Sequence, residues 1–208
     1  MREEGFLAFI DGVIQKNLPV LHRIESIREE VIQVNRRIIF ESSKAIESVH
    51  AKKFDEALQY IERAKLHLIK TREELGKEDA SSLLDKMLES GEREFFEAAL
   101  TYSFASSAPP DEILGEIDIK PIPLIMGIVD FTGELRRIFL DALVEGELLT
   151  AEESLRTIRH IYSTLIGLDV RVSMLPGFRK RLDIIRSQME RSTENLHLSR
   201  VSQRLRKS

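Results

Sequence analysis

Apolar residues recur at helical spacing along most of the chain. Between residues 18 and 52 they occupy positions 21, 24, 27, 31, 34 and 38, and then 45, 46 and 49, with no internal breaker. This pattern predicts one helix of about 35 residues. A shorter helix is expected before it, over residues 6–15. We expect Pro19 to stop or kink that helix, because proline removes a backbone hydrogen bond and clashes with the preceding turn.

Five further helices are predicted downstream, with no strand pattern of useful length between them. They cover residues 52–75, 81–106, 123–146, a stretch opened by a capping box at residues 150–153, and 177–204. The longest break, residues 106–123, holds four of the six prolines and is the best candidate for a mobile or partner-contacting loop. We therefore expect an all-α fold, with seven helices in one bundle-like domain over residues 1–208. The end of the last helix is expected to be frayed from about residue 200.

Composition narrows the class of protein. The chain is 42% hydrophobic and 32% charged, as expected of a globular protein. It contains no apolar run of 18 residues, so no membrane span is predicted. The start, "MREEGFLAF", carries two glutamates and does not have the pattern of a signal peptide. The absence of cysteine excludes disulfides and thiolate metal sites, and it fits a cytoplasmic protein.

The charge is unevenly distributed, although the net charge of −4 does not by itself indicate nucleic-acid binding. Residues 174–208 hold nine Lys or Arg against three acids, a net charge of +6, so the remainder of the chain carries −10. A basic C-terminal helix on an acidic body could attract polyanions. It could equally be a solvated helix face with a frayed end.

Two weaker patterns point elsewhere. "KKFDEALQYIERA" has the look of a tetratricopeptide unit, but no second copy is present and such units need stacking neighbours. Two Glu-x-x-His motifs, Glu47/His50 and Glu194/His197, match part of the ligand set of ferritin-like di-iron bundles. The alternative is that these histidines are ordinary solvated side chains.

A set of four carboxylates gives the strongest chemical signal. Asp130 and Glu134 lie one helical turn apart inside the apolar run "IMGIVDFTGEL", on the same face as Gly127, and Gly127 and Gly133 could admit another backbone. Glu94 and Glu97 share a helix face in "REFFEAA". Four converging carboxylates would repel one another unless divalent cations neutralise them, and oxygen-only ligands favour Mg²⁺ or Mn²⁺. Alternatively, Glu94 and Glu97 are boundary charges and Asp130 pairs with an arginine, such as Arg136 or Arg137.

The same residues resemble a known family. "PLIMGIVDFTGELRRI" closely resembles the D-x-T-G-E-L-x-R helix of TRAX, the translin-associated protein, and "REFFEAALTYSF" resembles that family's Q-E-Y-x-E-A-x-x-F helix. "NRRIIFESSKAI" is similar to its S-R-x-I-x-x-E-S-K segment, with Arg36, Glu41 and Ser42 matching, and "FRKRLDIIRSQMERSTENL" fits its closing helix. The match runs in one order from about residue 24 to residue 196, and the Asp-x-Thr-Gly-Glu-Leu motif is its most specific part.

The resemblance to the translin/TRAX superfamily implies seven helices, hollow oligomers and RNA handled in their interior. TRAX-type members are metal-dependent endoribonucleases on single-stranded RNA, including a passenger strand in RNA silencing. Translin-type members bind RNA or single-stranded DNA and lack the acidic set. By motif, Glu94, Glu97 and Asp130 fall on the TRAX catalytic carboxylates and Glu134 on the neighbouring acid, so the chain resembles the catalytic type.

The chain also departs from its relatives. It is shorter outside the helical core, with a compact loop at residues 106–123, and it lacks a basic nuclear-import run at its start. We therefore expect a compact, prokaryote-like member that assembles with itself into a hollow homo-oligomer, for which eight subunits is one candidate number. A separate translin subunit is not expected.

These observations predict a Mg²⁺- or Mn²⁺-dependent endoribonuclease. Glu94, Glu97 and Asp130 would ligate one or two ions, and Glu134 would complete the shell or position the attacking water; two ions would lie about 3.5–4 Å apart. RNA phosphates would be bound by Arg36, Arg37 and Lys44, with the C-terminal basic residues next. The alternatives are a non-catalytic single-stranded RNA/DNA-binding scaffold and a di-iron bundle.

Overall fold

A computed structural model describes residues 2–76, 84–168, 175 and 177–207. Those residues are all-α, with no strand among them. The helices are α1 Arg2–His50, α2 Phe54–Leu75, α4 Glu89–Ser106, α5 Pro110–Leu114, α6 Pro121–Glu145, α7 Leu148–Ile166 and α8 Phe178–Lys207. The predicted fold class is confirmed.

Seven helices were expected and seven are seen in the described residues, but they are not the same seven. The two N-terminal helices are one, because α1 continues through Pro19 without a stop. A proline interrupts one backbone hydrogen bond, and the long helix on either side is retained. The seventh helix is instead α5, inside the segment predicted as a loop. Its Ile113 is buried, as is Ile119 after it, so this segment packs against the core.

Several helix ends also differ from their predicted positions. α4 begins at Glu89, and residues 81–83 of its predicted start lie outside the described residues. The capping box at residues 150–153 is wrong, since α7 already begins at Leu148, and Thr150 lies inside the helix. α8 is helical to Lys207, beyond the position from which fraying was expected.

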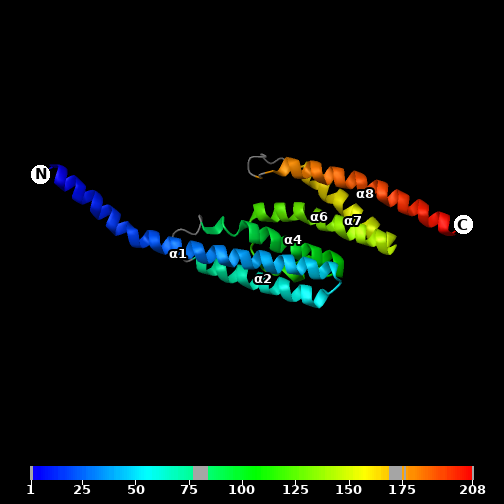
Figure 1. Cartoon of the computed structure of the whole chain (residues 1–208), viewed down its shortest axis with the longest axis horizontal. Helices are drawn as coiled ribbons and strands as arrows, with labels where there is room; N and C mark the ends of the chain where they lie inside the picture. Colours follow the sequence, from blue (N-terminus) through cyan, green and yellow to red (C-terminus); the bar gives the residue numbers. More distant parts are fainter. Residues whose placement is uncertain (1, 77–83, 169–174, 176, 208) are drawn as a thin grey trace.

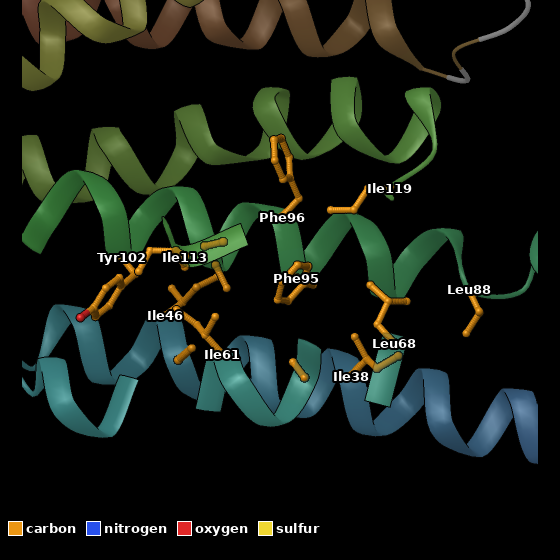
Figure 2. Close-up of a cluster of buried hydrophobic side chains, with 14 of the residues drawn as sticks. Ile38, Ile46, Ile61, Leu68, Leu88, Phe95, Phe96, Tyr102, Ile113 and Ile119 are labelled. Atoms are coloured by element: carbon orange, nitrogen blue, oxygen red, sulfur yellow. The ribbon is translucent and has the colours of Figure 1, made fainter. Parts of the chain in front are cut away.

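The helices form a stack in which α4 lies at the centre. α1 and α2 pack as a pair, α4 packs on both of them, and α6 packs on the other side of α4 (Figure 1). In Figure 2, Phe95 of α4 points toward α1 and α2, whereas its neighbour Phe96 points toward α6. α7 and α8 cover α6 around a second apolar cluster that includes Leu135, Ile158 and Ile185. The α4–α6 contact therefore joins the two halves of the molecule.

Gly127 allows α4 and α6 to approach closely. A Cβ atom added there would lie 3.0 Å from the backbone oxygen of Arg93 and 3.0 Å from Cδ1 of Phe96. The predicted close approach at Gly127 is confirmed. Gly133 has no such role within this chain, because nothing lies within 4 Å of the position that a Cβ atom would take there.

The first part of α1 extends away from the other helices and presents apolar side chains to solvent (Figure 1). Phe6 is 63% exposed and Phe9 is 66% exposed, and the exposed set continues along the helix to Leu21. Across the described residues, no helix is both long and apolar enough to span a membrane.

Candidate functional site

Two helices bring the four predicted carboxylates together. α4 carries Glu94 and Glu97, spaced three residues apart, and α6 carries Asp130 and Glu134, spaced four apart, so each pair lies on one helix face. The charges of Glu94, Asp130 and Glu134 all act on the Glu97 carboxyl. We call these four residues the carboxylate cluster.

Glu97 is the buried member of the cluster, with 8% of its surface exposed. Burial raises the pKa of Glu97 to about 8, and the negative charges of Glu94, Asp130 and Glu134 contribute, against a smaller opposing effect of Arg93. Its carboxyl is therefore mainly protonated at neutral pH when only protein groups surround it.

Asp130 forms ion pairs with two arginines from different helices. Arg93 Nε of α4 lies 3.0 Å from Asp130 Oδ2, and Arg181 Nη1 of α8 donates to Oδ1. Asp130 does pair with arginine, as the alternative interpretation expected. Its partners are Arg93 and Arg181, however, and not Arg136 or Arg137. Arg136 instead donates to the Gln188 carbonyl, 3.5 Å away, and to Ser192.

Glu134 is contacted by a histidine from the end of α1. His50 Nε2 lies 2.6 Å from Glu134 Oε2, and His50 Nδ1 lies 3.7 Å from Asp141 Oδ2. The His50 side chain is 6% exposed. An ionised carboxylate only accepts hydrogen bonds, so Nε2 carries the proton and fixes the position of Glu134.

The two Glu-x-x-His motifs do not form one site. Glu47 pairs with Lys44 at 2.6 Å on the surface of α1, and His197 is exposed on α8. α1 packs against α2 and α4, whereas α8 packs against α6 and α7. Within the described ranges, no three His, Asp or Glu side chains are arranged to hold a metal ion. The di-iron ligand set is therefore not assembled in this part of the chain.

The carboxylate cluster nonetheless has the donor chemistry of a hard divalent cation. All four donors are carboxyl oxygens, which suit Mg²⁺ or Mn²⁺ better than softer metals. A cation beside Glu97 would offset the three negative charges that raise the pKa of its carboxyl. Arg93 and Arg181 both form ion pairs with the Asp130 carboxylate, so a metal ion that binds Asp130 would have to displace them.

A basic pocket of about 300 Å³ adjoins the cluster. It is lined by Lys86, Glu89, Ser90, Arg93, Ile122, Pro123, Met126 and Arg181, and two of these are the arginines on Asp130. A second pocket, of about 560 Å³, includes His50 and Asp141 and lies beside the contact that His50 makes with Glu134. The cluster is therefore next to two pockets, one through Arg93 and Arg181 and the other through His50.

The three residues predicted to bind RNA lie on α1. Arg36 and Arg37 are exposed, and Arg37 lines a groove of about 420 Å³ with residues of α2, separate from the basic pocket. Lys44 is paired with Glu47, and the hydrogen bond from Lys44 to that glutamate raises the lysine pKa. None of the three lines the basic pocket.

The sequence interpretation did not include Arg93 or the contact of His50 with Glu134, and it included Arg181 only as one of the C-terminal basic residues expected to bind RNA phosphates. Arg93 directly precedes Glu94, and this adjacency is the one local signal for it. Arg181 lies 51 positions from Asp130, and no sequence pattern connects them. The sequence pattern does single out His50, but as a member of a motif pair with a different partner.

Comparison with known proteins adds to this geometry. No protein-family model matches the chain. It is 26% identical over 174 residues to an uncharacterized protein of Methanocaldococcus jannaschii, covering 81% of this chain and 74% of that protein. It is 22% identical over 147 residues to translin-associated protein X of Mus musculus, covering 67% of this chain and 46% of that protein.

Similarity to solved structures covers nearly the whole chain. The complex of AfC3PO with duplex RNA superimposes with a TM-score of 0.80 and 26% sequence identity, covering 91% of this chain and 97% of that one. The likeness thus includes every helix that contributes to the cluster, whereas the match to the mouse protein covers less than half of that protein.

Proposed function

The chain belongs to the translin/TRAX superfamily, and we propose that it is a catalytic, TRAX-like member, a Mg²⁺- or Mn²⁺-dependent endoribonuclease that cuts single-stranded RNA. The environment of Glu97 carries this proposal. That carboxyl is buried among three other carboxylates, which together with burial raise its pKa to about 8. This environment strongly opposes a negative charge on Glu97. A cation bound next to that carboxyl is therefore favoured. By motif, the same acids match the catalytic carboxylates of the TRAX type.

Glu94, Glu97 and Asp130 are the residues that would hold the metal. When bound, a divalent cation supplies polarisation of the phosphate and a lowered pKa of a bound water. Glu97 releases its proton before it can act as a ligand, so metal binding becomes tighter as pH rises. Glu134, fixed by His50, is placed to orient the attacking water and accept its proton.

The reaction on this view is hydrolysis of one phosphodiester bond. The water oxygen attacks phosphorus, one P–O bond to a sugar breaks, and the sugar oxygen takes up a proton. The packed helices α4 and α6 shield Glu97 from bulk water, whereas the other three carboxylates stay partly exposed and open to substrate.

The first test is cleavage of labelled single-stranded and duplex RNA by the purified protein, in Mg²⁺ and in EDTA. Duplex RNA is included because AfC3PO was crystallised with it. We expect cutting of the single strand that requires Mg²⁺ and is lost in Asp130→Asn. RNA binding without cutting, in Mg²⁺ or Mn²⁺, would instead support a non-catalytic translin-like scaffold. The ion pairs of Asp130 with Arg93 and Arg181 are the observation that favours this second function.

We also propose that the protein forms a homo-oligomer through the exposed apolar face of α1. Its side chains, from Phe6 to Leu21, include nine large apolar residues that are 38% exposed or more. Burial of such a face contributes about 25 cal/mol per Å² of apolar area, and a second copy of the same helix offers a matching surface. A molar mass equal to that of one chain in multi-angle light scattering would refute self-association.

A further inference from the structure

We propose that the basic pocket binds a backbone phosphate of RNA next to the one that is cut, and that Asp130 competes with this phosphate for Arg93 and Arg181. The identity of the ligand as RNA rests on the proposed function. The three α1 residues named first from the sequence as phosphate ligands lie elsewhere, and of the C-terminal basic residues named next only Arg181 lines the pocket. The pocket itself is therefore a new site, with phosphate as its ligand chemistry.

The charges lining the pocket favour an anion. Three cations, Lys86, Arg93 and Arg181, face it against a single acid, Glu89. Ser90 Oγ accepts a hydrogen bond from Asn35 Nδ2 at 2.9 Å, which leaves the hydroxyl proton of Ser90 for another acceptor. A volume of about 300 Å³ is sufficient for one phosphate group with part of its ribose.

The helices reinforce these charges. Glu89, Ser90 and Arg93 belong to the first turns of α4, Ile122 and Met126 to those of α6, and Arg181 to that of α8. Helix N-termini carry partial positive charge. Three of them converge on this pocket, together with the three cationic side chains, so the electrostatic preference for phosphate does not depend on any one residue.

Asp130 lies where the basic pocket meets the carboxylate cluster. Its two oxygens engage one arginine each, Arg93 at 3.0 Å and Arg181. Arg93 Nε is buried and makes no hydrogen bond of good geometry, although it lies within ion-pair distance of Asp130. The Arg93 side chain as a whole is 30% exposed, so a phosphate oxygen can reach the terminal nitrogens of its guanidinium group.

Competition for the arginines couples the two halves of the site. While Asp130 keeps its negative charge, it holds both guanidinium groups. A cation at Asp130, or loss of its charge, frees them for phosphate. RNA and metal then strengthen each other's binding, because both act against the same pair of arginine contacts.

The experiment measures binding of a labelled single-stranded RNA in EDTA, where the proposed nuclease is inactive. We expect Asp130→Asn to bind RNA several-fold more tightly than the wild type, and we expect Arg181→Gln to remove most of that gain in the double variant. Glu134→Gln provides the charge control, since it removes an acid from the same cluster whose contact is with His50 and not with Arg93 or Arg181. An equal gain from Asp130→Asn with and without Arg181 would overturn the competition.

Lys86→Ala tests the pocket independently of any ion pair with Asp130. It should weaken RNA binding and lower the slope of log affinity against log salt by about 0.7, the contribution of one phosphate contact on a single strand. Arg186→Ala is the matched control, because it removes the same charge from α8, where Arg186 is exposed and pairs with Asp183 at 3.6 Å. Equal slopes for the two variants would refute the pocket.

Three further outcomes test the proposals separately. If the pocket-dependent difference is present only with a 5′-phosphorylated RNA, the pocket binds a terminal phosphate and the assignment to an internal one is wrong. If the wild type cuts RNA but Lys86→Ala and Arg181→Gln bind like it, the nuclease stands and the pocket fails. Pocket-dependent binding without cutting in Mg²⁺ supports the pocket and refutes the nuclease.

Discussion

Two glutamates on α4, five positions apart, are both buried, yet their surroundings are opposite. Glu92 is completely buried and faces α2, where Arg72 Nε donates to its Oε1 at 2.8 Å. Glu97 is 8% exposed and lies with the carboxylates of α6 and Glu94. Burial raises the pKa of both carboxyl groups, but Arg72 opposes the rise at Glu92, whereas three acids add to it at Glu97.

The comparison separates a structural charge from a functional one. A buried acid is expected to be paired, and Glu92 meets that expectation through Arg72. The charges next to Glu97 are mostly negative, so they destabilise the ionised form of its carboxyl group. Burial alone therefore does not distinguish the two; the sign of the surrounding charge does, and it singles out Glu97 as the position where an added cation has the largest effect.

The largest expected effect is on catalysis by Glu97→Gln. If Glu97 is a metal ligand, the rate of RNA cleavage should fall by more than about 100-fold, since loss of partners that merely support a ligand already costs 10- to 100-fold. The fold should be retained, because a neutral amide suits a buried site that disfavours charge. Initial cleavage rates and the melting temperature, measured on the same preparation, check both parts.

Glu92→Gln is the control on the same helix. It should lower the melting temperature by weakening the contact with Arg72, while the cleavage rate per folded molecule stays within a few-fold of the wild type. Equal losses of cleavage in the two variants would show that the comparison between structural and functional glutamates is mistaken.

The next largest effect is on stability, from Arg72→Met. This change leaves Glu92 buried without its cation, which typically costs about 3–5 kcal/mol. For a chain of this size the melting temperature should fall by roughly 6–20 °C, as measured by calorimetry. The double variant Arg72→Met/Glu92→Leu should recover most of the loss, because it removes both charges. A double variant as unstable as the single one would mean that packing, and not the ion pair, determines the effect.

The sequence predicted the helices well because their signal is local and repeated. It failed where a neighbouring element decides the outcome. α7 begins at Leu148, ahead of the Thr150 capping pattern, because Gly146 ends α6 with φ of +80° and Glu147 N–H bonds back to the Ala142 carbonyl at 2.8 Å. At Pro19 the predicted stop is wrong, because α1 continues through that residue.

The site divides in the same way. Spacing alone placed Asp130 and Glu134 on one face of their helix and Glu94 and Glu97 on one face of theirs, and the motif resemblance added the catalytic assignment. Arg93 reaches Asp130 because α4 and α6 approach closely at Gly127. Arg181 comes from another helix and lies 51 positions from Asp130 in the chain. These are tertiary facts, so the basic pocket could not be predicted from periodicity or charge counts.

The last expected effect is a pH dependence of stability in the metal-free protein. The folded pKa of Glu97 is about 8, above its unfolded value of 4.5, so between these values the native state binds a proton that the unfolded state has lost. The stabilising contribution is complete below pH 4.5 and is lost as pH rises through 8.

In EDTA, the melting temperature of the wild type should therefore fall over this range more steeply than that of Glu97→Gln, which cannot titrate. Glu92→Gln, which keeps Glu97, should retain the part of the fall that Glu97→Gln loses. Parallel curves for the wild type and Glu97→Gln would mean that neither burial nor the neighbouring acids raise the pKa of Glu97 as the structure indicates, and the contrast with Glu92 would fail.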